Sequence, residues 1–148
     1  MTRKMLVIAA FAAVLAFAAV SGFAGGKREA GGAAAHPGVV TVDVIYLNHP
    51  PLIPVLAEVD KALQPYGDKV KVVKYDFDTS EGEAFAKQKH LVGHIPLVIF
   101  VNGSSTVTVA GTKVTFESFP KGEGPGMIPD GDWSVADLDA AVKGALAP

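Results

Sequence analysis

The sequence of 148 residues contains no cysteine. A chain without cysteine can neither close a disulfide nor use a thiolate as a nucleophile or a metal ligand. Thiol chemistry of every kind is therefore excluded, and the folded part has to be stabilised by its core.

The sequence also lacks a cluster of basic residues. It has 13 Lys and Arg against 15 Asp and Glu, and the loss of Arg3 and Lys4 with a leader would leave 11 basic side chains. This balance argues against a nucleic-acid or anionic-lipid partner. The glycines of GEGPG, residues 122–126, do not follow the strand-to-helix pattern of a phosphate site, so nucleotide binding is not expected.

A long hydrophobic run is present only at the N-terminus. The basic stretch MTRK precedes an apolar run over residues 5–20, and the small residues Gly22 and Ala24 follow. This order predicts a secretory signal peptide over residues 1–24 and an exported protein, periplasmic or secreted. An uncleaved anchor that tethers the protein to the membrane is the alternative, because the run approaches the length that spans a bilayer. The Gly/Ala-rich residues 25–38 then form a flexible tether.

Residues 39–148 are expected to fold as one α/β domain. Apolar β-branched runs predict strands, apolar residues at helical spacing predict helices, and Gly, Pro and Asn mark the turns. Trp133 and Phe85 are expected in the core. Thr79 or Ser80 caps the second helix, and Ser134 with Asp137 forms a capping box for the last one. The expected strands are 39–47, 69–77, 97–101, about 106–110 and a short one within 113–119; the expected helices are 52–63, 81–91 and 135–146.

The predicted order is β-α-β-α-β-β-α. The first two strands are joined through a helix and should be parallel, with a right-handed crossover. The strands 97–101 and 106–110 should form an antiparallel hairpin with its turn at Asn102 and Gly103. Together they predict one mixed sheet of four to five strands with helices on both faces.

This order resembles the thioredoxin-like superfamily over residues 39–146, and three local features contribute. HIP, residues 94–96, precedes the strand LVIFV as the family's cis-proline loop does, with Pro96 as the cis-proline candidate. Asp43 lies in the first strand, where the family has a buried acid below its active site. HPPL, residues 49–52, lies at the position of the family's Cys-x-x-Cys.

The resemblance implies a redox-inactive member. His49 stands in the place of the nucleophilic cysteine and Leu52 in that of the second cysteine, with Pro50 and Pro51 between them. Disulfide exchange needs a thiolate and a resolving thiol, and both are absent. We therefore expect no oxidoreductase activity and no catalytic residue.

Our first functional hypothesis is the binding of a protein or peptide partner across the face formed by residues 49–52 and 94–96. The resemblance implies that the proline loop pairs with an extended peptide by strand addition. A long inserted segment, about 110–132, borders this face and contains apolar side chains, including Met127. It either acts as a lid or only covers a sheet edge and extends the core.

The second hypothesis is metal binding without any other cofactor. The resemblance implies that His49 and His94 come together, and His90 lies four residues before His94. Imidazoles with a carboxylate can hold copper or zinc, and Asp43 could orient His49. The alternatives are that His90 is a solvated residue at a helix end and that His49 only caps the binding surface.

Overall fold

The computed structural model describes residues 38–147, so the predicted signal peptide and nearly all of the tether lie outside the described residues. Within this range no helix has both the length and the apolar character needed to cross a bilayer. The elements are, in order, β1 (Val40–Tyr46), α1 (Leu52–Leu63), the 3₁₀ helix η1 (Gln64–Lys69), β2 (Val70–Asp76), α2 (Ser80–Gln88), β3 (Leu97–Val101), β4 (Thr106–Val109), β5 (Thr112–Thr115) and α3 (Val135–Leu146).

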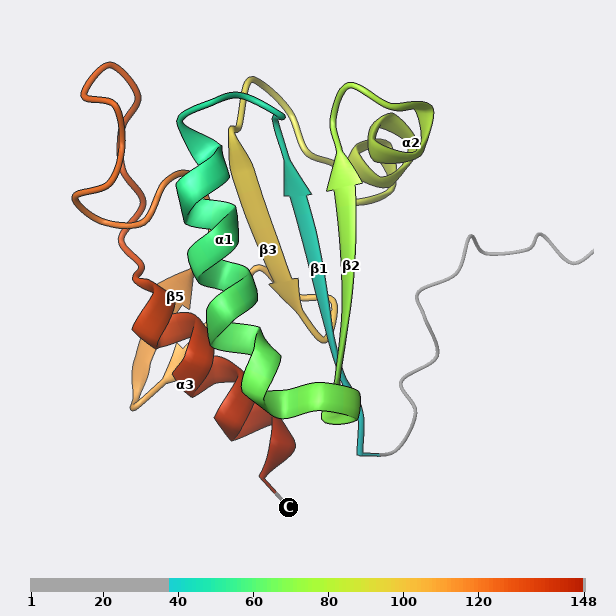
Figure 1. Cartoon of the computed structure of the whole chain (residues 1–148), viewed down its shortest axis with the longest axis vertical. Helices are drawn as coiled ribbons and strands as arrows, with labels where there is room; N and C mark the ends of the chain where they lie inside the picture. The colour runs from blue at the N-terminus through green and yellow to red at the C-terminus, as the bar shows by residue number, and fades with distance from the viewer. Residues whose placement is uncertain (1–37, 148) are drawn as a thin grey trace, which may run out of the picture.

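The centre of the fold is a three-stranded mixed sheet with the order β2-β1-β3 (Figure 1). β1 and β2 are parallel and begin in register at Val40 and Val70, with α1 and η1 as the connection between them. β3 is antiparallel to β1, and Tyr46 lies opposite Leu97. A mixed α/β arrangement with a small sheet and three α-helices is thus established, and the predicted parallel pairing of the first two strands is confirmed.

The predicted sheet of four to five strands is corrected by the structure. The turn at Asn102 and Gly103 is present, with φ values of 48° and 85°. However, this turn pairs only Val101 with Ser104. The amide of Val101 donates to the carbonyl of Ser104 over 2.9 Å. β4 then turns away and pairs with β5 in a separate two-stranded sheet. The predicted hairpin between 97–101 and 106–110 is therefore wrong.

The position beside β3 is taken instead by residues 116–118. The amide of Ile99 donates to the carbonyl of Phe116 over 2.9 Å, and the amide of Ser118 donates to the carbonyl of Leu97 over 2.8 Å. Phe116 is fully buried there, whereas Val107 of β4 stays half-buried. Burial of a large aromatic ring favours this pairing over that of the Thr/Val strand β4.

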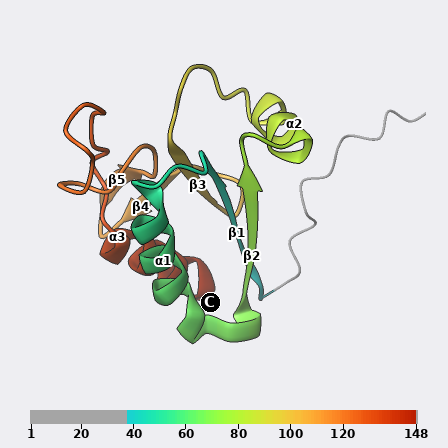
Figure 2. The same ribbon diagram turned by 45° about the horizontal axis from the view of Figure 1, so that its top comes forward.

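Helices cover both faces of the sheet, as predicted (Figure 2). The side chains of β1 alternate: Val42 and Val44 pack towards α1 and α3, while Ile45 packs towards Phe85 of α2. Trp133 is 1% exposed and lies against Phe116, with ring centroids 5.7 Å apart. The prediction that Trp133 and Phe85 belong to the core is confirmed.

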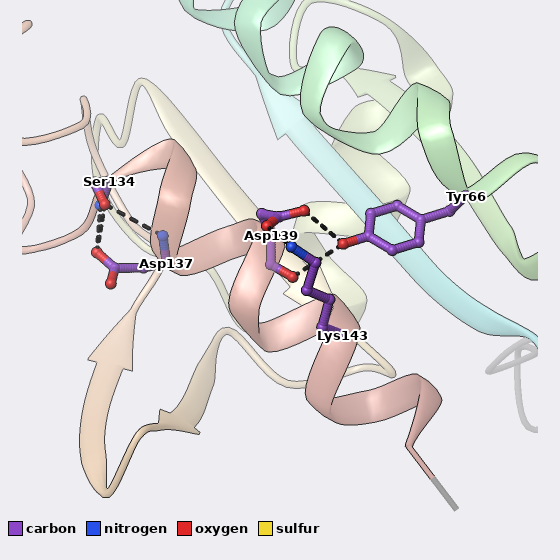
Figure 3. A network of polar contacts seen from close by, with 5 residues as sticks. All are labelled: Tyr66, Ser134, Asp137, Asp139 and Lys143. Carbon is purple, nitrogen blue, oxygen red and sulfur yellow. Dashed lines mark hydrogen bonds and ion pairs between the residues drawn. The ribbon is translucent and has the colours of Figure 1, made fainter.

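The predicted helix caps are also present. The hydroxyl of Thr79 accepts the amide of Gly82 over 3.1 Å at the start of α2. At the start of α3 the hydroxyl of Ser134 accepts the amide of Asp137, and the carboxylate of Asp137 accepts the amide of Ser134 (Figure 3). These bonds satisfy amides that a helix leaves without partners at its N-terminus.

Candidate functional site

The segment 49–52 and the loop 94–96 leave the sheet at the same end. Because β1 and β3 are antiparallel with Tyr46 opposite Leu97, the carboxyl end of β1 meets the amino end of β3. The pairing continues one step further, where the amide of Leu47 donates to the carbonyl of Pro96 over 2.9 Å. Pro96 is buried, so the loop has a fixed position beside the end of β1.

Residues 49–52 form the turn that starts α1. The amide of Leu52 donates to the carbonyl of His49 over 2.9 Å, and Pro51 is the N-cap. His49, Pro50 and Pro51 are exposed, whereas Leu52 is 1% exposed and anchors the helix in the core. A proline suits this position because the first amides of a helix have no partner within it.

Asp43 is half-buried rather than buried, which corrects the prediction of a buried acid. By strand alternation its side chain shares the α2 face with Ile45, while α1 covers the opposite face. Burial raises the pKa of its carboxyl, and the positive charges of Lys89 and Lys71 oppose this shift. The charged neighbours of Asp43 are thus lysines on the α2 side, and the structure provides no support for the idea that it orients His49.

The three histidines of the proposed metal set, His49, His90 and His94, are all exposed. His90 has a positive φ of 56° just beyond α2. Over residues 38–147 no group of three His, Asp or Glu side chains is arranged to hold a metal ion. The antiparallel register places His49 and His94 in facing loops at one end of the sheet.

A groove of about 350 Å³ opens beside the proline loop. One wall is formed by residues 94–96, and the other by residues 117–118 and 128–131. It therefore joins two of the segments that the sequence singled out, the proline loop and the inserted segment. We call this feature the groove.

The second wall of the groove is held by close contacts of Ser118 and Phe119 with residues 129–131. Ser118 has a positive φ of 65°, and its hydroxyl donates to the carbonyl of Pro129 over 2.5 Å. The amide of Gly131 donates to the carbonyl of Phe119 over 2.7 Å. A Cβ on Gly131 would lie 2.1 Å from the carbonyl oxygen of Glu117, so only glycine permits this approach.

The inserted segment is shorter than predicted. Residues 112–115 form β5 and residues 116–118 pair with β3, which leaves residues 120–132 as the inserted loop. The carboxylate of Asp130 accepts the amides of Gly122 and Gly124, each over 2.8 Å. These bonds give the loop a defined shape without a helix or strand, and Met127 at its tip is 93% exposed.

Sequence reasoning did not predict Glu117, Ser118 or Asp130 as site residues. The strained backbone of Ser118 and the return of the chain to Phe119 leave no periodic pattern in the sequence. Asp130 stands in the turn-forming stretch IPDGD, which is a local signal for a turn but not for a groove.

His94, Ser118 and Asp130 line the same groove, but they do not form a hydrolytic triad. The hydroxyl of Ser118 is bonded to the carbonyl of Pro129, and the carboxylate of Asp130 is bonded to two glycine amides. A triad requires hydrogen bonds from serine to histidine and from histidine to the acid. The hydroxyl of Ser118 and the carboxylate of Asp130 thus hold the shape of the groove wall.

We compared the chain with protein-family models, with curated proteins and with solved structures, and nothing matches it.

Proposed function

We propose that this protein is an exported, redox-inactive module with a thioredoxin-like fold that binds a protein or peptide partner. The observation that carries the proposal is the groove, because it lies between the proline loop 94–96 and the inserted loop. A groove with unpaired backbone groups of residues 94 and 95 in one wall suits an extended peptide better than a compact small molecule.

Free backbone groups in the proline loop support peptide pairing. Within the described part of the chain, the amides and carbonyls of His94 and Ile95 make no hydrogen bond. A bound extended segment can supply the missing partners, as strand addition does at the edge of a sheet. Because the neighbouring Pro96 is buried and bonded to Leu47, these groups are presented in a fixed position.

Apolar side chains next to these groups support the same function. Ile95 and Ile128 line the groove from opposite walls and are half-buried. Met127 is exposed at the tip of the inserted loop, and a flexible thioether adapts to varied apolar surfaces. The arrangement therefore offers apolar contact on both sides of the free backbone groups.

The thioredoxin-like assignment rests on the element order and on residues 49–52 and 94–96. The order β-α-β-α-β is followed by an antiparallel segment and a C-terminal helix, and the turn 49–52 starts α1 beside the proline loop. With no cysteine in the chain, disulfide exchange has no nucleophile at this turn. The export assignment rests on residues 1–24 of the sequence.

Selection from a random peptide library displayed on phage tests the proposal. Selected peptides are synthesised, and their affinity for the purified protein is measured by fluorescence anisotropy. We expect Ile95→Asp to weaken binding by at least about tenfold, because it places a charge in the groove. Thr108→Asp, an exposed position on β4, is the matched control and should leave the affinity unchanged. The proposal is overturned by a library that yields no binder, or by binders that are indifferent to Ile95→Asp.

Binding of Cu(II) or Zn(II) by His49 and His94 is the second candidate, since the β1–β3 register places their loops at one end of the sheet. Calorimetric titration with each metal tests it. Loss of affinity in both His49→Ala and His94→Ala supports a shared site, and His90→Ala reports whether a third imidazole takes part. An affinity that His49→Ala leaves unchanged rejects this site.

A further inference from the structure

The groove has an acidic wall. Its lining contains two carboxylates, Glu117 and Asp130, and no Lys or Arg among the described residues. The lining also contains the imidazole of His94. The fixed charges around the bound segment are therefore negative.

The two carboxylates differ in how many hydrogen bonds they already accept. Both oxygens of Asp130 accept glycine amides over 2.8 Å. Glu117 accepts only one side-chain hydrogen bond, from the hydroxyl of Ser105 to its Oε1 over 3.4 Å. A carboxylate has about four acceptor positions, so Glu117 keeps most of its capacity. None of the ion pairs found in residues 38–147 includes it.

The backbone that carries Glu117 is fixed on both sides. Its neighbours Phe116 and Ser118 pair with β3, and Glu117 lies opposite Val98. Its own carbonyl accepts the indole Nε1–H of Trp133 over 3.0 Å, and Trp133 is 1% exposed. The backbone at Glu117 is therefore already ordered before binding, which lowers the entropic cost of a contact there.

The inserted loop adds to the negative potential. Burial raises the pKa of Glu123, and the negative charges of Glu58 on α1 and of Asp130 raise it further. Asp130 of the groove lining therefore has a further carboxylate, Glu123 of the inserted loop, close enough to interact with it. Opposite charge on a ligand both accelerates the encounter and fixes the register in which it binds.

We propose that the groove selects an extended peptide segment that carries a Lys or Arg side chain, whose positive charge pairs with Glu117 while its backbone pairs with residues 94–96. This inference rests on the proposed peptide-binding function and names the chemistry of the ligand. Glu117 is the specificity residue, and Asp130 holds the shape of the wall and contributes charge.

The test uses groove-binding peptides from the library selection, each synthesised in three forms that differ at one position: Lys, norleucine or Glu. Norleucine retains the aliphatic part of the side chain and removes the charge. For the native protein we expect the Lys form to bind about tenfold more tightly than the norleucine form, as a charge-assisted contact predicts, and the Glu form to bind most weakly.

The Glu117→Gln variant keeps the size of the side chain and its bond to Ser105, so its fold should be intact by circular dichroism. We expect it to reduce the preference for Lys over norleucine to less than about twofold. Glu81→Gln, an exposed carboxyl-to-amide change on α2, is the matched control and should retain the preference. Raising the salt concentration should weaken the Lys form more than the norleucine form.

The outcomes separate the two proposals. Peptides that depend on Ile95 but bind equally with Lys, norleucine or Glu overturn the charge selection and leave the peptide-binding function standing. A Lys preference that survives Glu117→Gln also overturns it. Peptide binding that is unchanged by Ile95→Asp overturns the proposed function, and it overturns this inference as well.

Discussion

The hydroxyl of Tyr66 donates to Oδ1 of Asp139 over 2.5 Å and thereby joins η1 to α3 (Figure 3). The same hydroxyl lies 3.2 Å from the carbonyl oxygen of Asp139. Lys143, one turn further along α3, donates to Oδ2 of Asp139 over 2.6 Å. The three side chains connect the segment after α1 to the C-terminal helix on the same face of the sheet.

Tyr66→Phe should lower the free energy of unfolding by about 1 kcal/mol, because it removes a partly buried hydrogen bond to a carboxylate. Urea denaturation measures this change. Asp139→Asn and the double variant complete a mutant cycle, in which we expect a coupling of at least about 0.5 kcal/mol. Strictly additive effects would show that the contact contributes nothing to stability.

The same pair predicts a pH dependence at alkaline pH. Burial, together with the hydrogen bond and the charge of Asp139, raises the pKa of Tyr66 to about 12. The protonated phenol is thus favoured in the folded state, so its stabilising contribution is complete below about pH 10 and is lost as the pH rises towards 12. The difference in stability between the native protein and Tyr66→Phe should shrink over this range. Ultraviolet titration of tyrosinate, native minus variant, should show one group ionising near pH 12 and not near pH 10.

The stability contribution of Asp139 depends on pH in the opposite sense, and the change falls at acid pH. Hydrogen bonds from Lys143 and Tyr66 hold the pKa of its carboxyl below the usual range. Its contribution is therefore present above the unfolded value near 4 and is lost as the pH falls through the folded value.

Asp43→Asn should stabilise the protein at neutral pH. Burial raises the pKa of Asp43, so the ionised form is disfavoured in the folded state relative to the unfolded chain. The amide removes this cost, and the gain should vanish as the pH falls below about 4, where the carboxyl is neutral in both states. Denaturation of both proteins at pH 7 and pH 3.5 measures the gain. Equal stability at pH 7, or a gain that persists at pH 3.5, would contradict this explanation.

Two glycine-to-alanine substitutions should change the stability of the protein in opposite directions. A Cβ on Gly82 would lie 1.8 Å from the carbonyl oxygen of Asp76, so Gly82→Ala forces α2 away from β2 and should cost about 2 kcal/mol or more. Gly144 lies in α3 with open space around it, and Gly144→Ala should stabilise by about 0.5–1 kcal/mol through helix propensity. Thermal unfolding compares the two variants. A neutral Gly82→Ala would mean that α2 does not approach β2 this closely.

Asp130→Ala should loosen the inserted loop by removing the acceptor of two amides. We expect faster hydrogen exchange at Gly122 and Gly124 and a global loss of no more than about 1–2 kcal/mol. Asp132→Ala, at an exposed position two residues away, is the control. Unchanged exchange at both glycines would show that Asp130 does not shape the loop.

The sequence predicted the elements whose signals are local. Leu52, Val55 and Val59 recur at helical spacing after two prolines, and Thr79 and Ser134 cap helices through contacts within four residues. The run 40–46 is mostly apolar, and helices cover both faces of this strand. In each case the signal and the structure lie within one segment of the chain.

The partner of β3 could not be predicted in this way. The stretches 106–109 and 116–118 compete for the same edge, and the outcome depends on the burial of Phe116 against Trp133, which follows 17 residues later in the sequence. The groove could not be predicted from the sequence for the same reason. Its walls come from residues 94–96 and from two further segments that meet only because Ser118 turns the chain and Asp130 shapes the loop. Contacts of this kind are set by the tertiary fold and not by periodicity.

Both ends of the described chain lie at the end of the sheet opposite the loop that leads into β3 (Figure 1). Gly38 precedes the amino end of β1, whereas the proline loop meets its carboxyl end, about 20 Å away along a strand of this length. The molecule therefore has two distinct poles, with both ends of the described chain at one and the groove at the other. A label attached at Gly38 or Ala147 therefore lies at the pole opposite the groove and leaves the groove lining uncovered.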